Sequence, residues 1–251
     1  MRALITGASS GIGRDIAREL SKRGYDLIIV ARNREKLEEL KEDLTTEVEI
    51  IAMDLTIDEN CKKLYEQARD IDILVNNAGL GEFGKFAETD IEKELTIIKT
   101  NITALHVLTK LYLQDMIKRN SGRILNVASI AGFMPGPLMA TYYASKAYVV
   151  RLSEAIREEL NKQNSKVKIS LLCPGPVKTN FNNVANVKFE INSLTSEYVA
   201  RYAVNKMLRN KFYIVPGLTI KLAKFFSKIT PTVVLAKCSY HMQKRKRWVL
   251  K

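Results

Sequence analysis

Short apolar stretches alternate with longer amphipathic stretches along most of the chain. Segments such as 12–23 and 34–44 repeat their apolar residues at helical spacing. The stretches between such segments are short and rich in β-branched residues, as buried parallel strands are. These predicted strands are residues 3–5, 26–30, 48–52, 73–75, 123–127 and 167–172, with a last short strand at 212–215.

This alternation of strand and helix predicts an α/β fold. Parallel strands joined by helices form a doubly wound sheet, here of about seven strands, with helices on both faces. No internal repeat, low-complexity stretch or Pro/Gly/Ser linker divides the chain. We therefore expect residues 1–217 to form a single domain, followed by an extension over residues 218–251.

The extension has its own pattern. Residues 218–228 place lysines three and four apart among apolar residues, which predicts a basic amphipathic helix. Pro231 is expected to end this helix, and a second apolar stretch follows. The net charge of the chain is +13, yet residues 216–251 contain nine of the forty Lys and Arg and no Asp or Glu. The basic excess therefore belongs to the extension, and nucleic-acid binding is not expected, because the body lacks a basic stripe interleaved with aromatics.

Cysteine and histidine usage argues against metal or histidine chemistry. Cys61, Cys173 and Cys238 are far apart, and neither they nor His106 and His241 have the spacing of a metal site. The thiols are expected to be reduced. The chain starts directly with a strand and a glycine turn, which leaves no room for a secretory signal, and no apolar run reaches the roughly 18 residues of a membrane span. The expected location is cytoplasmic.

A glycine-rich turn follows the first predicted strand and opens the first predicted helix. The sequence from Thr6 to Gly13, TGASSGIG, has glycines at Gly7, Gly11 and Gly13. At this position free backbone N–H groups and the helix dipole can hold a dinucleotide pyrophosphate. The spacing G-x-x-x-G-x-G departs from the commonest dinucleotide fingerprint, and an ordinary strand-to-helix loop is the alternative. Its position between strand and helix favours the nucleotide site.

Arginine ends the second predicted strand, where an NAD-preferring site usually has an acidic residue for the ribose 2′-OH. Arg32, with Arg14 beside the glycine turn, can pair with a 2′-phosphate instead. This predicts NADP(H) as the cofactor. Arginines that only solvate the end of a strand are the alternative, which the ratio of kcat/KM for the two cofactors decides.

A tyrosine and a lysine four residues apart form the candidate catalytic pair. Tyr142 and Lys146 lie on one face of a predicted helix, and a nearby ammonium favours the phenolate and so eases proton exchange. The spacing alone occurs by chance. It gains weight from Ser129, which ends the fifth strand at the sheet edge where such folds bind ligands.

With these residues in order, the chain resembles the short-chain dehydrogenase/reductase family from Met1 to about Pro216, a family with a Rossmann-like fold. Asn101, Ser129, Tyr142 and Lys146 match its four catalytic positions. The cofactor positions implied by the resemblance, together with Arg32 from above, are Gly7, Ser9, Ser10, Gly11, Ile12, Gly13, Arg32, Asp54, Leu55, Asn77, Ala78, Gly79, Tyr142, Lys146, Pro174, Gly175, Val177 and Thr179.

The resemblance implies a mechanism and an assembly. Residues 1–217 become a dinucleotide-binding and catalytic domain that transfers hydride between nicotinamide and a carbonyl or secondary alcohol. Tyr142 exchanges the proton, Ser129 polarises the substrate oxygen and Lys146 lowers the pKa of Tyr142 and holds the ribose, while Asn101 seats a water. A homodimer or homotetramer built from the helices with Asn101 and Tyr142 is implied. An NADPH-binding sensor without turnover, or a membrane-associated binding protein, is the alternative.

The substrate is expected to be hydrophobic, such as a fatty-acyl, steroid-like or aromatic carbonyl compound. Residues 131–139 and a lid near 180–195 contain the apolar side chains Phe133, Met134, Leu138, Met139, Phe181 and Phe189. Simple packing of the lid is the alternative. The extension is expected either to pack on the protein or a sister subunit, or to lie on an anionic membrane through Lys221, Lys224 and Lys228.

Overall fold

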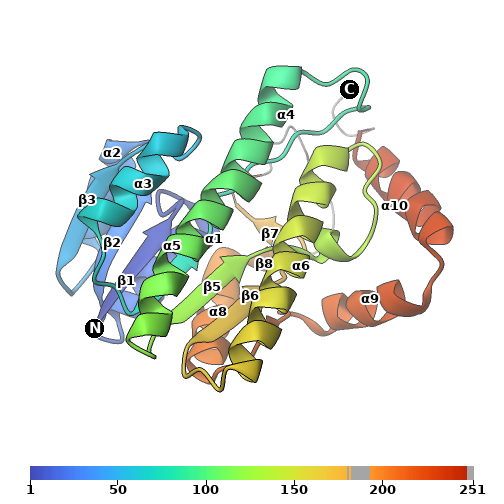
Figure 1. Cartoon of the computed structure of the whole chain (residues 1–251). Coiled ribbons are helices and arrows are strands. Elements are labelled where there is room, and N and C mark those ends of the chain that lie inside the picture. The colour runs from blue at the N-terminus through green and yellow to red at the C-terminus, as the bar shows by residue number, and fades with distance from the viewer. Residues whose placement is uncertain (180, 182–192, 248–251) are drawn as a thin grey trace.

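A seven-stranded parallel sheet forms the centre of the protein, in the order β3-β2-β1-β4-β5-β6-β9 (Figure 1). The computed structural model describes residues 1–179, 181 and 193–247. The strands of this sheet are β1 (Arg2–Thr6), β2 (Asp26–Ala31), β3 (Val48–Ala52), β4 (Ile73–Asn76), β5 (Arg123–Val127), β6 (Lys168–Leu172) and β9 (Tyr213–Ile214). Each coincides with a stretch predicted from the sequence to within two residues at either end.

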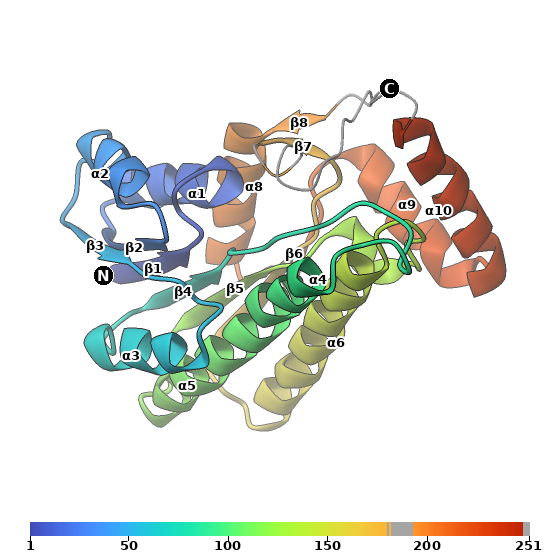
Figure 2. The ribbon, with the colours of Figure 1, turned by 90° about the horizontal axis from the view of Figure 1, so that it is seen from above.

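Helices cover both faces of the sheet, which confirms the predicted doubly wound α/β fold. Figure 2 shows α1, α2 and α8 on one side and α3, α5 and α6 on the other. The helical elements are α1 (Gly11–Ser21), α2 (Arg34–Glu42), α3 (Asp58–Gln67), α4 (Ile91–Ile98), the π-helical turn η1 (Lys99–Ala104), α5 (Leu105–Lys118), the 3-10 turn η2 (Ile130–Phe133), α6 (Ala140–Lys162), α8 (Ser196–Leu208), α9 (Leu218–Ile229) and α10 (Thr232–Arg247).

Strands β1 and β4 contain apolar runs without alternation because both of their faces are buried. In β1, Leu4 packs into the core on the α3–α5–α6 side, whereas Ala3 and Ile5 pack into the core on the α1–α2–α8 side. All three side chains are fully buried. Successive side chains of a strand point to opposite faces, so a continuous apolar run supplies two cores at once.

The order of the strands places a crevice beside β1. The chain passes from β1 to β2 and β3 on one side, then returns to β4 and continues outward on the other side. At such a reversal the connections leave the carboxyl ends of two neighbouring strands in opposite directions, and the crevice between them is the usual ligand position in open α/β sheets. The ends of β1 and β4, at Thr6 and Asn76, therefore fix where a site can form.

Buried polar side chains tie the strands on the other side of this crevice. Asn76 of β4 donates from Nδ2 to Thr109 Oγ1 and to Asn126 Oδ1, both at 2.9 Å. Asn126 of β5 donates in turn to Ser153 Oγ of α6 at 3.0 Å. Since unpaired buried amides are costly, these bonds fix the relative positions of β4, β5, α5 and α6.

The chain after the sheet forms two further helices. As expected from the lysine spacing, residues 218–229 are helical, and Pro231 separates α9 from α10. A short ladder that the sequence did not predict, β7 (Val177–Lys178) with β8 (Leu194–Thr195), brackets the expected lid. Most of that lid, residues 180 and 182–192, lies outside the described residues. Among the helices that are described, none is long and apolar enough to cross a membrane.

Candidate active site

A cleft of about 420 Å³ opens at the carboxyl edge of the sheet, where the strand order reverses. Eighteen of the twenty predicted site residues line it; the two others, Gly13 and Asn101, lie behind its wall. The lining residues among those predicted are Gly7, Ser9, Ser10, Gly11, Ile12, Arg32, Asp54, Leu55, Asn77, Ala78, Gly79, Ser129, Tyr142, Lys146, Pro174, Gly175, Val177 and Thr179.

The glycine turn requires glycine for two different reasons. Gly7 and Gly11 have φ of +66° and +55°, a region that side chains with a Cβ avoid. At Gly13 the reason is crowding, because a Cβ there would lie 2.3 Å from Asn77 Nδ2 and 2.4 Å from the Gly7 carbonyl oxygen. The first turn of α1 contains no acidic residue, and Ser10 makes no side-chain cap. This helix end therefore fits an anionic pyrophosphate.

The end of β4 is held directly against the glycine turn. Thr6 Oγ1 accepts hydrogen bonds from the backbone N–H groups of Asn77 at 3.0 Å and Ala78 at 3.1 Å. Asn77 Nδ2 donates to the carbonyl oxygens of Thr6 at 3.0 Å and Gly7 at 3.1 Å. The segment Asn77 to Gly79 thus forms the wall that faces the turn, and its position does not depend on a bound molecule.

One end of the cleft is basic. Arg32 lies there with Asn33 and Lys36, two residues that the sequence reasoning missed. Asn33 caps α2 by accepting from the Lys36 backbone N–H at 2.8 Å. The cap starts the helix directly after Arg32, so the lysine of its first turn comes to the same wall. An Asn at the end of a strand, three residues before Lys, is the signal that could have found it.

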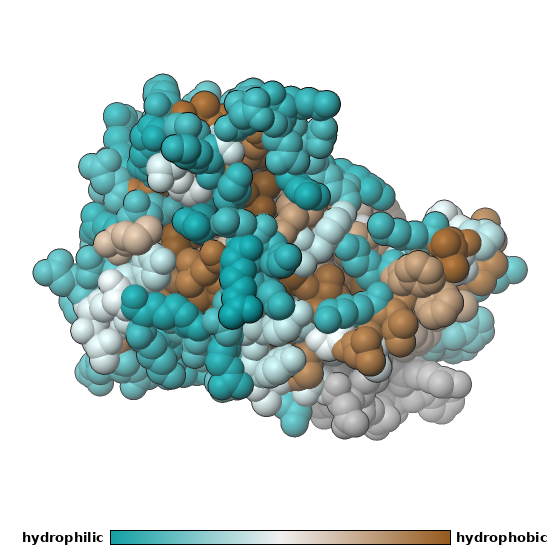
Figure 3. Space-filling view, turned by 90° about the horizontal axis from the view of Figure 1, so that it is seen from below, coloured by the Kyte–Doolittle hydropathy of each residue, from teal (hydrophilic) through white to brown (hydrophobic). Residues whose placement is uncertain are grey.

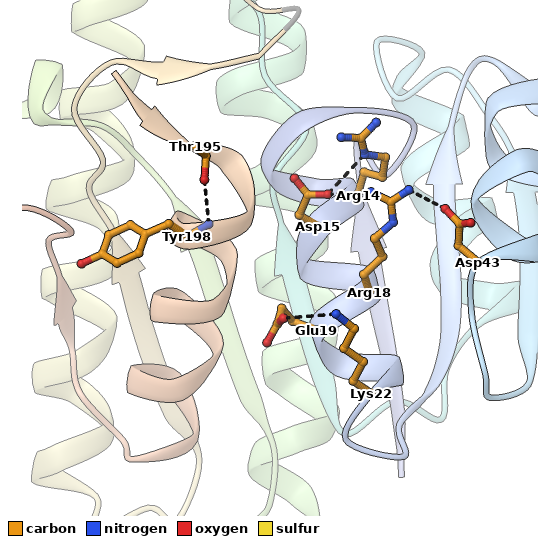
Figure 4. A network of polar contacts seen from close by, with 8 residues as sticks. All are labelled: Arg14, Asp15, Arg18, Glu19, Lys22, Asp43, Thr195 and Tyr198. Atoms are coloured by element: carbon orange, nitrogen blue, oxygen red, sulfur yellow. Dashed lines mark hydrogen bonds and ion pairs between the residues drawn. The ribbon is translucent and has the colours of Figure 1, made fainter. Parts of the chain in front are cut away.

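Arg14 does not line the cleft, so its predicted contact with a 2′-phosphate stays a prediction. Its Nε donates to Asp15 Oδ1 at 3.3 Å. Figure 4 shows this contact within a polar network of α1, in which the terminal nitrogens of Arg14 point away from Asp15 and Arg18 binds both Asp15 and Asp43. Asp15 is 2% exposed, and a buried carboxylate requires such partners.

Two predicted wall residues follow β3, beside the basic end of the cleft because β3 pairs with β2, and they also stabilise the local structure. Asp54 Oδ1 accepts from the backbone N–H and the hydroxyl of Thr56, at 2.9 and 2.8 Å, which fixes the turn after β3. Leu55 is buried beside it. Thr179 leans over the glycine turn, since a Cβ on Gly11 would meet its Cγ2 at 2.8 Å.

Tyr142 and Ser129 meet in the cleft. Ser129 follows β5 and Tyr142 lies in the first turn of α6; both line the cleft, and Ser129 lies close enough to Tyr142 to influence the pKa of its hydroxyl. Ser129 Oγ accepts from the Ala131 backbone N–H at 3.2 Å and donates to the Pro174 carbonyl oxygen at 3.4 Å, which holds it at the start of η2. A phenol and a hydroxyl this close together in one cleft form a pair able to contact a single substrate oxygen.

The pKa of Tyr142 differs from the expectation. Removal from water raises the pKa of the Tyr142 hydroxyl to about 12, although the neighbouring Ser129 side chain opposes the shift. The predicted lowering by Lys146 does not outweigh this desolvation in the protein alone, where the lysine Nζ lies 5.8 Å from the centre of the tyrosine ring and donates to another group. Tyr142 is therefore protonated at neutral pH, which suits a proton donor.

Lys146 is buried and tied to the sheet. Its side chain donates from Nζ to the Val127 carbonyl oxygen at 2.9 Å, at the end of β5. Burial lowers the pKa of Lys146 to about 8. A Cβ on Gly79 would lie 3.3 Å from this Nζ and 3.4 Å from Asn101 Oδ1, so Lys146 and Asn101 both reach the space that a side chain at this position would fill.

Asn101 supports the site from behind the wall. It lies in η1, a π-helical turn between α4 and α5, and is 1% exposed. Its amide pairs with both backbone groups of Leu80, accepting at 2.8 Å and donating at 2.9 Å, and it donates to Ser145 Oγ at 2.9 Å. Ser145 donates to the Tyr142 carbonyl oxygen at 2.7 Å. Sequence reasoning missed Ser145, which joins Asn101 to the helix turn of Tyr142.

The far end of the cleft is apolar and aromatic. Met139 and Phe181 line it as predicted, with Phe181 5.3 Å from the Tyr142 ring centre. Tyr143 and Gln243 also line it, and Gln243 of α10 donates to the Tyr143 hydroxyl at 2.6 Å. A residue a hundred positions away could not be assigned to the cleft from its sequence context.

Three other residues of the predicted apolar pocket lie elsewhere. Phe133 turns away from the cleft and packs against Tyr213 and the ammonium of Lys224. Neither Met134 nor Leu138 lines the cleft. Phe189 lies outside the described residues. Among the predicted apolar side chains of residues 131–139, Met139 therefore faces the cleft, whereas Phe133 packs elsewhere on the protein. In the described part of the chain, no cluster of His, Cys, Asp or Glu could hold a metal.

Comparison with known proteins places these features in a family. The sequence profile of the family described as short chain dehydrogenase matches residues 1–188. The chain is 37% identical over 182 residues to an uncharacterized oxidoreductase of Staphylococcus epidermidis, covering 70% of this chain and 78% of that protein. It is 33% identical over 186 residues to a 3-oxoacyl-[acyl-carrier-protein] reductase of Haemophilus influenzae, covering 72% and 76%.

Solved structures give the same result. A short-chain dehydrogenase of Sphingobium yanoikuyae in complex with NADPH superposes with a TM-score of 0.82 at 28% identity, covering 91% of this chain and 93% of that one. A short chain dehydrogenase/reductase of Burkholderia phymatum in complex with NAD reaches 0.81 at 25% identity, covering 89% and 91%. The fold is thus shared with one protein solved in complex with NADPH and one solved in complex with NAD.

Proposed function

The chain belongs to the short-chain dehydrogenase/reductase family, and on this basis we propose that it is an NADP(H)-dependent oxidoreductase acting on a hydrophobic carbonyl or secondary alcohol. The observation that carries the proposal is the meeting of Tyr142 and Ser129 in the same cleft as the glycine turn. A sensor without turnover would be favoured by a broken catalytic set, whereas all four residues are present here. Residues 1–217 supply this set, and we propose them as the catalytic domain.

The cleft fits a nicotinamide dinucleotide. Gly7, Gly11 and the open start of α1 accept the pyrophosphate, and the basic end accepts a phosphorylated ribose. We place the nicotinamide end between the Pro174–Thr179 turn and Lys146, which lines the cleft beside Tyr142. When bound, the cofactor supplies the hydride chemistry, and the protein supplies orientation and electrostatics.

The proton comes from this chain. In carbonyl reduction Tyr142 Oη donates its proton to the substrate oxygen, and Ser129 Oγ donates a hydrogen bond to the same oxygen. The raised pKa of Tyr142 keeps the proton in place until the oxygen becomes strongly basic. Lys146, whose pKa is about 8, is mostly charged at neutral pH and favours the phenolate that remains. Asn101 holds the turn at Leu80 and Ser145 and so positions both residues of α6.

Cofactor preference rests on the basic end of the cleft. Replacing Arg32 by Asp is expected to lower the ratio of kcat/KM for NADPH to that for NADH about 10- to 100-fold, because a charge-assisted contact contributes about 1.5–3 kcal/mol and Asp repels a 2′-phosphate while accepting from a 2′-OH. Steady-state kinetics with each cofactor measures the ratio.

Arg34→Asp is the matched control for this substitution. The Arg34→Asp substitution changes the charge by the same amount, two residues from Arg32. Arg34 pairs with Glu38 and does not line the cleft. Its cofactor ratio is expected to stay within about two-fold of the wild type, since it lies outside contact distance of the phosphate. Equal effects of the two variants would show that the preference comes from overall charge and not from Arg32.

The substrate end favours an apolar carbonyl compound. Met139, Phe181 and Tyr143 surround Tyr142 with apolar and aromatic surface, with the amide of Gln243 beside them. The H. influenzae relative is named a 3-oxoacyl reductase, which makes 3-oxoacyl thioesters the first compounds to test. Loss of NADPH absorbance across 3-oxoacyl thioesters, aromatic ketones and small polar carbonyls tests the proposal. A protein that binds NADPH but turns over none of these compounds would instead be a sensor without turnover.

We propose a homodimer or homotetramer built on α4, α5 and α6. Ile91, Leu95 and Ile98 of α4 are spaced by four and three residues and are each more than a third exposed. Such a stripe on a helix is the pattern of a face that packs against another helix. Light scattering of the purified chain measures the assembly.

A further inference from the structure

The outward side of α9 is a continuous apolar stripe. Its five members are each at least half exposed and are spaced by three or four residues: Leu218, Leu222, Phe225, Phe226 and Ile229. Val233, at the start of α10, is also 68% exposed. Apolar side chains gather on the end of the molecule where α9 and α10 lie, on the right in Figure 3. We call these six residues the α9 stripe. Exposed apolar patches of this kind mark interaction sites.

The opposite side of α9 is packed on the protein. Ile220 fills the space beside the Pro174–Gly175 turn, where a Cβ on Gly175 would lie 2.4 Å from Ile220 Cδ1. Lys224 lies over the rings of Phe133 and Tyr213. The helix is therefore held in place by its inner side, and the α9 stripe is presented outward on a fixed helix. The expectation that the extension packs on the protein thus holds for the inner side of α9.

Positive charge borders the α9 stripe. Lys221 and Lys228, both exposed, follow one edge of it on the same helix. Next to this edge is an open cavity of about 330 Å³, whose walls include Lys206, Lys211, Lys221 and Lys224 with Tyr202, Tyr213 and Val215 and contain no acidic residue. Glu154, which interacts with Lys224, is engaged by Arg151 and Tyr213. The whole segment 216–251 has no acidic residue.

We propose that the α9 stripe and the lysines along its edge form a surface that binds an anionic lipid bilayer. Helices with an apolar face and lysines beside it lie in the membrane interface, where the apolar side chains enter the acyl boundary and the lysines meet lipid phosphates. A second copy of this chain fits less well, because a two-fold contact on this surface would bring two acid-free basic segments together. The α4 stripe proposed for assembly lies on a different part of the protein (Figure 2).

The same extension reaches the cleft. Gln243 of α10 is 2% exposed and lines the apolar end of the cleft, next to Tyr143. The bilayer surface and the substrate end of the site are thus built from consecutive helices of one segment. This point rests on the function proposed above, which takes a hydrophobic substrate. Such a substrate would be concentrated in the bilayer that this surface contacts.

Vesicle flotation of the purified full chain tests the surface without cofactor or turnover. Vesicles of phosphatidylcholine alone are compared with vesicles that also contain phosphatidylglycerol. The wild type is expected to float with the anionic vesicles at low salt and to be released at high salt, since each lysine near the surface contributes about 1 kcal/mol that ions screen. The Lys221→Gln/Lys228→Gln variant is expected to bind about 30-fold more weakly. Leu222→Gln/Phe225→Gln is expected to reduce binding at least about ten-fold.

Matched controls change equally exposed residues elsewhere. Phe86→Gln removes a phenylalanine that is 70% exposed, and Lys110→Gln removes an exposed lysine of α5. Both are expected to float as the wild type does. Failure of the wild type to float, or equal binding to neutral vesicles, would overturn the proposal. Loss of flotation in the two controls as well would show that no specific surface exists. If the wild type does not float and the Leu222→Gln/Phe225→Gln variant has a smaller oligomeric state than the wild type, the α9 stripe is instead a contact with a second copy of this chain.

Discussion

Replacing Tyr142 by Phe is expected to lower kcat for carbonyl reduction about 10³-fold while leaving NADPH affinity within a few-fold of the wild type. The change removes the hydroxyl that donates the proton beside Ser129, and it keeps the ring that packs against Phe181. The glycine turn and the basic end of the cleft are untouched. Stopped-flow or steady-state absorbance measures kcat, and NADPH fluorescence measures binding.

Tyr143→Phe is the control for this substitution. Tyr143 is the neighbour in sequence, lines the same cleft and loses an equivalent hydroxyl, which accepts from Gln243. Its ring packs over Gly136, and its hydroxyl engages α10. We expect a change in KM of a few-fold with little change in kcat, because a neutral hydrogen bond contributes about 1 kcal/mol. A larger loss of kcat in Tyr143→Phe than in Tyr142→Phe would exchange the roles of the two tyrosines.

Replacing Lys146 by Met is expected to lower kcat/KM about 100-fold or more and to change how stability depends on pH. The pKa of Lys146 falls from 10.5 to about 8 on folding. Below pH 8 the folded state carries the full cost of the buried charge. As pH rises from 8 toward 10.5, the folded state releases its proton before the unfolded chain does, so the stability of the wild type increases.

The pH dependence separates the charge from packing. Relative to Lys146→Met, the free energy of unfolding of the wild type should increase by about 2 kcal/mol between roughly pH 7 and 9.5. Loss of the bond to the Val127 carbonyl is independent of pH over this range and does not contribute. Lys110→Met, at an exposed position of α5, should show no such difference. Denaturant unfolding at several pH values measures these free energies. Parallel pH curves for the wild type and Lys146→Met would mean that burial does not lower the pKa of Lys146.

The strands and the central helices could be predicted because each is dictated locally. After Asp26, strand β2 is an unbroken run of apolar residues, and its two faces enter two cores, so no partner needs to be known to identify it. The glycines were predictable for a similar reason. Gly7 and Gly11 have backbone angles that only a few residue types adopt, and this restriction is visible in the sequence.

The remaining site residues depend on packing between distant segments. Arg14 and Arg32 are both arginines near the glycine turn, yet only Arg32 lines the cleft, where Lys36 from the start of α2 joins it. Phe133 and Met139 lie in one loop, but only Met139 faces the cleft. No local pattern distinguishes these choices, since each depends on which partner lies within contact distance.

The sequence by itself determined the order of strands and helices and the glycine turn, because backbone preference and hydrophobic periodicity act over a few residues. The set of Asn101, Ser129, Tyr142 and Lys146 came from the resemblance of the sequence to the family. The tertiary structure alone decided the protonation of Tyr142, the entry of Gln243 into the cleft and the outward direction of the α9 stripe. These properties arise from desolvation and contact between segments far apart in the chain. Local sequence does not encode the distances on which such interactions depend.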